Sequence, residues 1–315
     1  MKIRDWGVFT LLAAIWGSSY LFIKIGLNDL QPFTLVAVRL ALGAAGMWII
    51  VAVMRLPLPR DWKTIAKLSL LGFTNTTLPF VLITWGETRI DSGVASVLNA
   101  TVPLFSLIIA HFFLEDEKIT WLRLGGLTTG FLGIVLIFSE HIGDIFGGGD
   151  AGSAMTLLAQ LAVIGASVAY AGSSVFAKTQ VKKIHPMMVA GFQLGSAFVW
   201  SAISAVVVEW PLQIQMSNQS VFALAWLGIL GTCIAYVIYF HLINVWGATR
   251  TTLVTYLIPV LGVSLGALVL GEQADWRLLA GFALIASGIG LVNARRPSQP
   301  APKEAATPET AELSG

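Results

Sequence analysis

The stretch EKITWLRLGGLTTGFLGIVL at residues 117–136 returns near the end of the chain as EQADWRLLAGFALIASGIGL at residues 272–291. A shift of 155 residues aligns six identical side chains: Glu117 with Glu272, Trp121 with Trp276, Leu124 with Leu279, Gly126 with Gly281, Gly133 with Gly288 and Leu136 with Leu291. Chance gives scattered identities, but not an ordered series of this kind. The chain therefore contains an internal repeat.

The repeat continues in the earlier part of each half. A shift of 154 residues aligns Ser19, Phe22, Lys24, Pro32 and Leu40 with Ser173, Phe176, Lys178, Pro186 and Leu194. In the same register Trp16 meets Tyr170 and Arg39 meets Gln193, while a shift of 156 aligns Pro103 with Pro259. The shift varies between 154 and 156 residues because the loops of the two halves differ in length by one or two residues.

The composition excludes a water-soluble domain. Of the 315 residues, 56% are hydrophobic and 11% are charged, whereas soluble domains carry about 25% charged residues. The net charge of +2, from 19 basic and 17 acidic residues, is too balanced for a nucleic-acid-binding protein. The lone cysteine, Cys233, excludes a disulfide framework and a cysteine-based zinc site. The composition indicates a membrane protein with several spans.

Ten apolar runs are long enough to cross a bilayer as helices, which takes about 20 residues. They are 6–26, 32–54, 65–86, 91–113, 121–139, 154–178, 186–208, 219–243, 248–270 and 276–293. We expect a first repeat at 6–139, a linker at 140–153, a second repeat at 154–294 and a disordered cytoplasmic tail at 295–315, which is rich in Pro, Ala and Glu.

The distribution of basic residues predicts the orientation. Fifteen Lys and Arg residues lie on the side of the two termini, and two, Arg89 and Arg277, lie on the opposite side. Since cytoplasmic loops are enriched in Lys and Arg, both termini are predicted to be cytoplasmic. Each half has five spans, an odd number, so the second half must be inverted relative to the first. Inverted repeats with a binding site between them are typical of secondary transporters that work by alternating access.

Three motifs resemble one family. They are WGSSYLFIKIGL from Trp16, SVLNATVPLF from Ser96 with FLEDEKITWLRLGG from Phe113, and the later echo LIPV and LVLGEQ with Trp276. Together they resemble the drug/metabolite transporter superfamily, specifically its EamA-type ten-helix members, over about residues 6–294. The first half departs from the usual Leu-Gly-Glu turn, reading Leu114-Glu115-Asp116-Glu117.

The resemblance implies a transporter in the bacterial inner membrane that exports small organic metabolites, often amino acids or related compounds. Its partners would be the lipid bilayer and a small-molecule substrate, with no cofactor, no metal and no nucleic acid. Uptake or exchange by the same fold stays open, and so does the oligomeric state, a monomer included. A membrane-embedded enzyme is disfavoured, because no acidic residue lies inside a span except at its edge and the four His have no metal-ligand spacing.

Several residues are candidates for the transport site. Arg39 is the one charge clearly inside a span, and it either anchors a substrate carboxylate or is a structural cation. Pro103 and Pro259 are candidate hinges, since each can bend its helix. Lys24, Lys178, Glu117 and Glu272 are candidate gating residues, although helix capping explains the two Glu equally well. The other candidates for substrate binding are the polar or aromatic residues Trp16, Asn75, Asn99, Thr101, Tyr170, Gln193, Tyr236, Tyr239 and Thr255.

Overall fold

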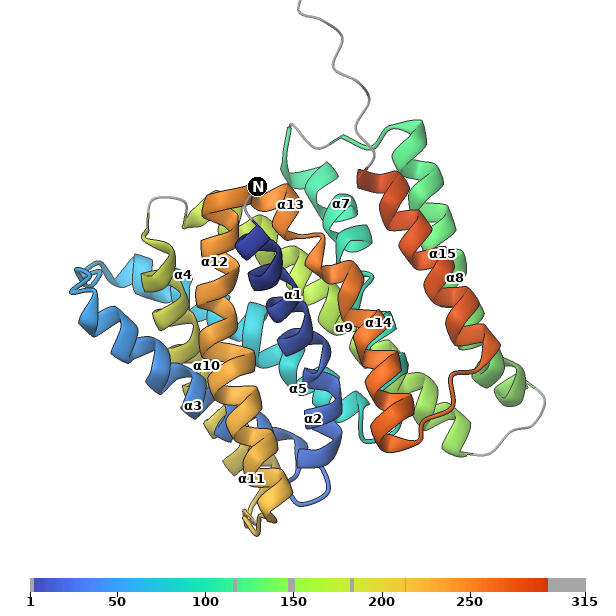
Figure 1. The fold of residues 1–315 in the computed structure, drawn as a ribbon, viewed down its shortest axis with the longest axis horizontal. Coiled ribbons are helices and arrows are strands. Elements are labelled where there is room, and N and C mark those ends of the chain that lie inside the picture. The colour runs from blue at the N-terminus through green and yellow to red at the C-terminus, as the bar shows by residue number, and fades with distance from the viewer. Residues whose placement is uncertain (1–2, 116–117, 147–150, 182–183, 213, 294–315) are drawn as a thin grey trace, which may run out of the picture.

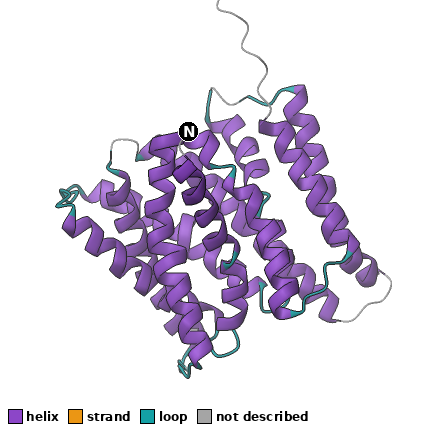
Figure 2. Cartoon of the chain, in the orientation of Figure 1, coloured by secondary structure: helices purple, strands orange, loops and turns teal. Residues whose placement is uncertain are grey.

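The computed structural model describes residues 3–115, 118–146, 151–181, 184–212 and 214–293. Within these ranges every regular element is helical and no strand occurs (Figure 2). This confirms the predicted all-α class. Three predictions fall wholly or partly outside the described residues: Glu117 as a gating residue, positions 147–150 of the linker, and the tail at 295–315.

The helices follow the predicted spans closely. In the first half they are α1 (Ile3–Gly17), α2 (Ser19–Gly26), α3 (Pro32–Val53), α4 (Trp62–Gly72), η1 (Phe73–Thr77), α5 (Leu78–Gly86), α6 (Ser92–Asn99), α7 (Val102–Phe113) and α8 (Trp121–Phe146). In the second half they are α9 (Ala151–Gln180), α10 (Pro186–Glu209), α11 (Asn218–Ala225), η2 (Trp226–Ile234), α12 (Ala235–Trp246), α13 (Ala248–Thr251), α14 (Val254–Leu265), η3 (Gly266–Leu270) and α15 (Trp276–Asn293).

Nine helices in the described part of the chain are long and apolar enough to cross a membrane. The remaining predicted span, 248–270, is divided: α13 ends at Thr251, and the apolar segment Val254–Leu270 is shorter than the others. Local signals explain where several helices begin. Pro32 and Pro186 each stand at the first helical position, where a missing N–H costs nothing. The Asp61 carboxylate accepts the Thr64 N–H at 3.0 Å and so caps α4.

The two candidate hinge prolines act differently. The chain leaves the helix at Ala100 and Thr101, directly before Pro103, and the Asn99 carbonyl that Pro103 cannot reach accepts the Ser167 hydroxyl at 3.5 Å. Pro259 lies inside the continuous helix α14, and the break in the second half comes earlier, at Thr252 and Leu253. The helix breaks therefore do not match residue for residue.

Two π-helical segments interrupt corresponding spans of the two halves. In η1 the Thr77 hydroxyl donates to the Gly72 carbonyl at 3.4 Å, and in η2 the Thr232 hydroxyl donates to the Leu227 carbonyl at 2.8 Å. Both bonds reach back five residues, which is the π-helical spacing. Segments of this kind occur frequently at functional sites, and each contacts the other half of the chain: Thr76 of η1 accepts a hydrogen bond from Gln193, and Thr232 of η2 accepts one from Arg39.

Helices α8 and α15, which contain the repeated stretch, pack on each other at one side of the bundle (Figure 1). Glycines bring their backbones together: a methyl group added at Gly126 would lie 2.6 Å from the Gly288 carbonyl oxygen, and one at Gly133 would lie 2.6 Å from that of Gly281. Small residues are known to permit such close contact between membrane helices. The glycines of the repeated stretch therefore permit the close packing of α8 on α15.

The other helices pack largely across the two halves. Pairs with extensive contact across the halves are α3 with α10, α5 with α9, α3 with η2, α7 with α9, and α1 with α14. Figure 1 shows the N-terminus, α13 and the end of α7 at one end of the bundle. It shows the start of α11 and the connection after α14 at the opposite end. Because these helix pairs join the two halves, a change in their packing would change the shape of the space between the halves.

Candidate functional site

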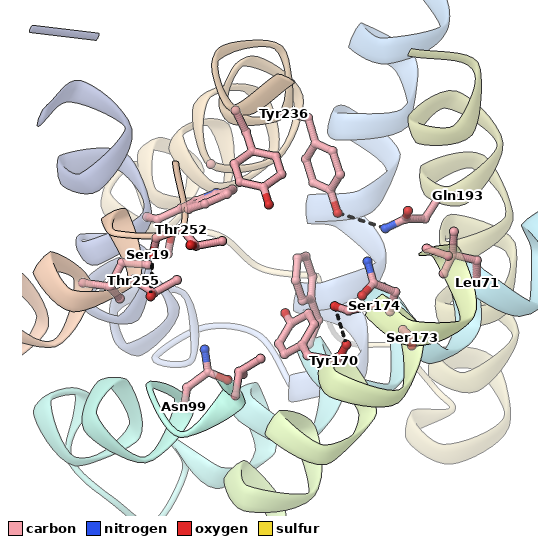
Figure 3. Close-up of a pocket in the computed structure, with 18 of the residues that line it drawn as sticks. Ser19, Leu71, Asn99, Tyr170, Ser173, Ser174, Gln193, Tyr236, Thr252 and Thr255 are labelled. Carbon is pink, nitrogen blue, oxygen red and sulfur yellow. Dashed lines mark hydrogen bonds between the residues drawn. The ribbon is translucent and has the colours of Figure 1, made fainter. Parts of the chain in front are cut away.

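A cavity of about 580 Å³ lies between the two halves. Ligand sites commonly have volumes of about 300–1,000 Å³, so the cavity has the size of a small-molecule site. Figure 3 shows Asn99, Tyr170, Gln193, Tyr236 and Thr255 around its open centre. The residues come from spans of both halves, which is where a transporter of inverted repeats would bind its substrate.

Nine of the ten candidate binding residues line this cavity: Trp16, Arg39, Asn75, Asn99, Tyr170, Gln193, Tyr236, Tyr239 and Thr255. The tenth, Thr101, does not. Its side chain is fully buried and its hydroxyl donates to the Leu98 carbonyl at 2.6 Å, within its own chain segment. Of the hinge candidates, Pro103 lines the cavity, while Pro259 is buried in α14.

Arg39 is the charged residue of the cavity wall. It lies on α3, two turns from Pro32, and its side chain is 5% exposed. Its Nε donates to the Thr232 hydroxyl at 3.1 Å, and its guanidinium lies 4.0 Å from the centre of the Phe80 ring. No carboxylate among the described residues lies within ion-pairing distance of it. A buried guanidinium held in place without a counter-ion is suited to bind an anionic group.

Asn99 provides a complementary polar group. Its Nδ2 donates to the Tyr20 hydroxyl at 2.8 Å, while its Oδ1 is buried and has no hydrogen-bond partner. An unpaired buried acceptor is costly unless something else satisfies it. Across the cavity, the Nε2 of Gln193 donates to Thr76 at 2.7 Å and to Tyr236 at 2.9 Å (Figure 3).

Aromatic side chains form much of the remaining wall. The Trp16 and Tyr239 rings pack with their centres 5.4 Å apart, and Tyr239 also packs against Phe240. Tyr20 and Tyr170 line the cavity from α2 and α9. A wall of rings with a few polar groups can hold an apolar or aromatic body while the polar groups fix its orientation.

The cavity reaches only one end of the bundle. Its lining includes Val181 and Ile184 in the connection from α9 to α10, and Thr252 before α14. Among the described residues, no residue of the connections at the opposite end lines it. We call these two ends the open end and the closed end. By the distribution of basic residues, the open end is the one predicted to face the cytoplasm.

Carboxylates from the second half hold the closed end together. Glu272 accepts the backbone N–H groups of Ser92 and Gly93, at 2.8 and 3.1 Å, and so caps α6. Glu209 accepts those of Phe33 and Thr34, both at 2.8 Å, and caps α3. Negative groups at helix N-termini are favourable. Glu272 thus performs the helix capping that was the alternative to gating, across the two halves.

A further contact at the closed end joins Asp29 to the start of α11. Its carboxylate accepts the Ser217 N–H at 2.7 Å. Hydrogen bonds from Ser217 and then Ser220 lower the pKa of Asp29 below its usual value. The other gating candidates lie at the two ends: Lys24 is in the last turn of α2 near the closed end, and Lys178 is exposed near the end of α9.

Glu87 lies directly after the predicted span 65–86 and is not among the residues for which the sequence predicts a function. It follows directly after α5, is 0% exposed, and neither carboxylate oxygen has a hydrogen-bond partner. Burial, with a smaller contribution from Glu272, raises its pKa well above the usual value, although Lys24 and Arg39 act in the opposite direction. The only signal in the sequence was an acidic residue directly after an apolar run.

Comparison with known proteins supplies the family. The EamA-like transporter family matches residues 6–139 and again 157–294. The chain belongs to the EamA-like transporter family. This confirms the resemblance that the motifs indicated, and it identifies a multi-pass membrane protein of ten helices whose relatives are transporters.

Individual EamA relatives agree at lower identity. The uncharacterized transporter YoaV of Bacillus subtilis is 28% identical over 283 residues, covering 87% of this chain and 91% of the relative. The uncharacterized inner membrane transporter YedA of Escherichia coli K12 is 27% identical over 282 residues, covering 87% and 86%. A protein of Streptantibioticus cattleyicolor named "Probable terminal-alkyne amino-acid exporter" is 27% identical over 307 residues, covering 95% of each chain.

A solved crystal structure matches with a TM-score of 0.63 at 18% sequence identity, over 92% of this chain and 96% of the solved one. At that identity the match supports the fold alone.

Proposed function

We propose that this EamA-family protein is a secondary transporter that exports small amphoteric metabolites, amino acids or related compounds, by alternating access. The observation that carries the proposal is the central cavity, closed at one end and open at the other, with two polar residues of different character in its wall. These are Arg39, whose guanidinium has no counter-ion in the described chain, and Asn99, whose amide is neutral.

The two groups match the two charged ends of an amino acid. The carboxylate would bind the Arg39 guanidinium through charge-assisted hydrogen bonds, which are roughly twice as strong as neutral ones. The ammonium group would bind beside the polar side chain of Asn99, which lines the cavity. The apolar body would then lie against Trp16 and Tyr239, whose rings already pack together. The relative named as an amino-acid exporter supports this substrate class.

Contacts across the centre support two inverted halves that move against each other. Arg39 of the first half bonds to Thr232 in η2 of the second, and Gln193 of the second half bonds to Thr76 in η1 of the first. These crossed pairs are what a two-fold axis in the membrane plane would produce. The proposed units are the repeats 6–139 and 154–294 with the linker between them.

The proposed location is the inner membrane of a bacterium, with both termini in the cytoplasm, in keeping with the printed name of YedA. In this orientation the open end of the cavity faces the cytoplasm, and the structure is the state in which an exporter loads its substrate. Single cysteines at Gln215 and Arg60, both exposed and at opposite ends, test this in a Cys233→Ser background. The cysteine at residue 215 should react with an impermeant thiol reagent in intact cells, and the one at residue 60 only after permeabilisation.

The transport experiment has two stages. Cells that overproduce the protein are first screened for resistance to toxic concentrations of amino acids and analogues. The purified protein is then reconstituted in liposomes, and exchange of each radiolabelled amino acid against the same unlabelled compound is measured. We expect saturable exchange of at least one amino acid. Absence of exchange for every amino acid, with protein that is folded and inserted, would refute the proposed substrate class.

A further inference from the structure

Glu87 is a buried carboxyl group that the proposed binding site does not use. Its side chain is 0% exposed, and neither oxygen accepts a hydrogen bond within the described chain. It forms no ion pair there within 4.0 Å. A carboxylate in such surroundings has lost its hydration without a replacement, whereas the neutral acid loses much less. The arrangement therefore stabilises the protonated form in this conformation.

Its position links it to both the closed end and the cavity. Five residues after Glu87 in the chain, Ser92 donates its backbone N–H to Glu272 at 2.8 Å. On the cavity side, the Glu87 carboxyl interacts electrostatically with Tyr20, whose hydroxyl is bonded to Asn99 in the cavity wall. Opening of the Glu272 cap would move the connection at 87–91 and expose Glu87 to water.

The charged groups around Glu87 come from several elements. Lys24 on α2, Arg39 on α3 and Glu272 before α15 act on its carboxyl. Asp91 lies in the same connection, on the surface, and interacts with Glu272 and Lys24. Helix α9 packs against Gly86 through Ala159 and Val163, and residues 151–169 of that helix carry no titratable side chain. Burial, not a single partner, is thus the main cause of the raised pKa of Glu87.

We propose that Glu87 is the proton-binding site that couples transport to the proton gradient, and that its protonation state is linked to opening of the Glu272 cap. This rests on the proposed function. With the cap open, the carboxylate meets water at the outer end and takes up a proton, and the neutral acid is then buried as the cap closes. In the substrate-free state that is open to the cytoplasm the buried acid keeps its proton, and the proton leaves to the cytoplasmic side when substrate binding displaces the Asn99–Tyr20 contact on the cavity side of Glu87. One proton moves inward as substrate moves outward, and no other bond forms or breaks.

The sign of the pH dependence follows. In the closed conformation the pKa of Glu87 is raised, so low pH stabilises that conformation. As pH rises through the raised pKa, this stabilisation is lost and the closed end opens. The ratio of open to closed molecules should rise by up to about tenfold per pH unit in that range, because one group titrates.

A substrate-free measurement tests this directly. Spin labels at Thr88→Cys and Gln273→Cys, in a Cys233→Ser background, replace neutral exposed residues on the two sides of the Glu272 cap. Electron resonance in lipid nanodiscs then gives the distance between the labels at about pH 5.5 and about pH 8.5, values chosen to bracket a buried glutamic acid. We expect a short distance at low pH and a longer population at high pH. In Glu87→Gln, which mimics the protonated acid, the short distance should persist at both values.

Control variants assign the effect to Glu87. Asp275→Asn removes an exposed carboxylate from the same connection as Glu272, and Asp91→Asn removes the other acid of the Glu87 connection. Both should keep the pH response.

Glu87→Asp retains a titratable group with a shorter reach, so its pH midpoint should shift. If Glu87→Gln does not fold, an unchanged midpoint in Glu87→Asp overturns the proposal. A normal pH response in folded Glu87→Gln, no response in the parent protein, or its loss in Asp91→Asn overturns it as well.

A transport measurement separates this proposal from the proposed function. For the amino acid that the parent protein exchanges fastest, Glu87→Gln should retain exchange but lose uptake driven by an imposed pH gradient, by about tenfold or more. Retained gradient-driven uptake contradicts coupling at Glu87. Absence of exchange for every amino acid in the parent protein refutes the substrate class only, because the spin-label measurement uses no substrate.

Discussion

The helix pair α8–α15 and the helix pair α3–α10 each join corresponding spans of the two halves, but they contribute different things. In α8 and α15 the corresponding positions Gly126 and Gly281 are the same residue, and so are Gly133 and Gly288, and neither helix lines the cavity. In α3 and α10 the corresponding residues Arg39 and Gln193 differ, and both line it.

This difference follows from what each position contacts. Backbone contact between α8 and α15 leaves room for a hydrogen atom alone, so both halves keep glycine. A binding site for an amphoteric compound needs a cation at one end only, so identical residues in both halves would not serve it. The repeat thus keeps identical residues at these packing positions and differs at the position that carries the charge of the cavity wall.

The largest effect should come from filling the contact between α8 and α15. A Cβ at Gly288 would lie 2.5 Å from the Gly126 carbonyl oxygen. Because this neighbour is a backbone atom, the overlap could be relieved only by moving one helix away from the other. We expect Gly288→Val to destabilise the protein by about 3 kcal/mol or more, at the upper end of overpacking costs. Thermal unfolding in detergent, followed by size-exclusion chromatography, measures this. Gly290→Val is the matched control, since a Cβ there has no neighbour within 4 Å. Equal stability of the two variants would contradict the assignment.

The next effect should come from the charge of the α3–α10 pair. Arg39→Ala removes the cation of the cavity wall, and loss of a charged hydrogen bond costs about 1.5–3 kcal/mol, hence about 10- to 150-fold in apparent affinity. Concentration dependence of exchange in liposomes checks this, and Arg39→Lys should retain more activity than Arg39→Ala. Arg60→Ala, at an exposed position outside the cavity, should behave as the parent protein. If Arg39→Ala lowers the amount of folded protein and not its activity, Arg39 is a structural cation.

The sequence predicted the helices well because bilayer thickness imposes a long apolar run on every span. The run 186–208 became α10 (Pro186–Glu209), and 32–54 became α3 (Pro32–Val53). Local departures from the α-helix carried no such signal. The π-helical segments η1 and η2, and the break at Thr252, depend on side-chain hydrogen bonds and on packing between the halves.

The cavity residues were partly predictable for a similar reason. Polar residues deep inside a span are costly in lipid, so residues such as Asn99 and Gln193 are candidates for the cavity wall from the sequence alone. Thr101 shows the limit of this reasoning, because a hydroxyl can bond to its own backbone and needs no cavity. Glu87 and Glu209 could not be recognised, since capping and burial at a span end depend on the partner helix that arrives there.

The smallest effect should come from the uncharged member of the pair, Gln193. Its Nε2 joins Thr76 of η1 to Tyr236 of α12, so it fixes the wall without offering a free group to the substrate. Gln193→Ala should weaken apparent affinity by about 0.5–1.5 kcal/mol, or roughly 2- to 12-fold, because neutral hydrogen bonds are lost. Exchange measurements in liposomes test this beside Gln180→Ala, an exposed glutamine of α9 that lies outside the cavity. A loss in Gln193→Ala as large as that in Arg39→Ala would mean that both halves bind the substrate equally, and the asymmetry inferred for the α3–α10 pair would be wrong.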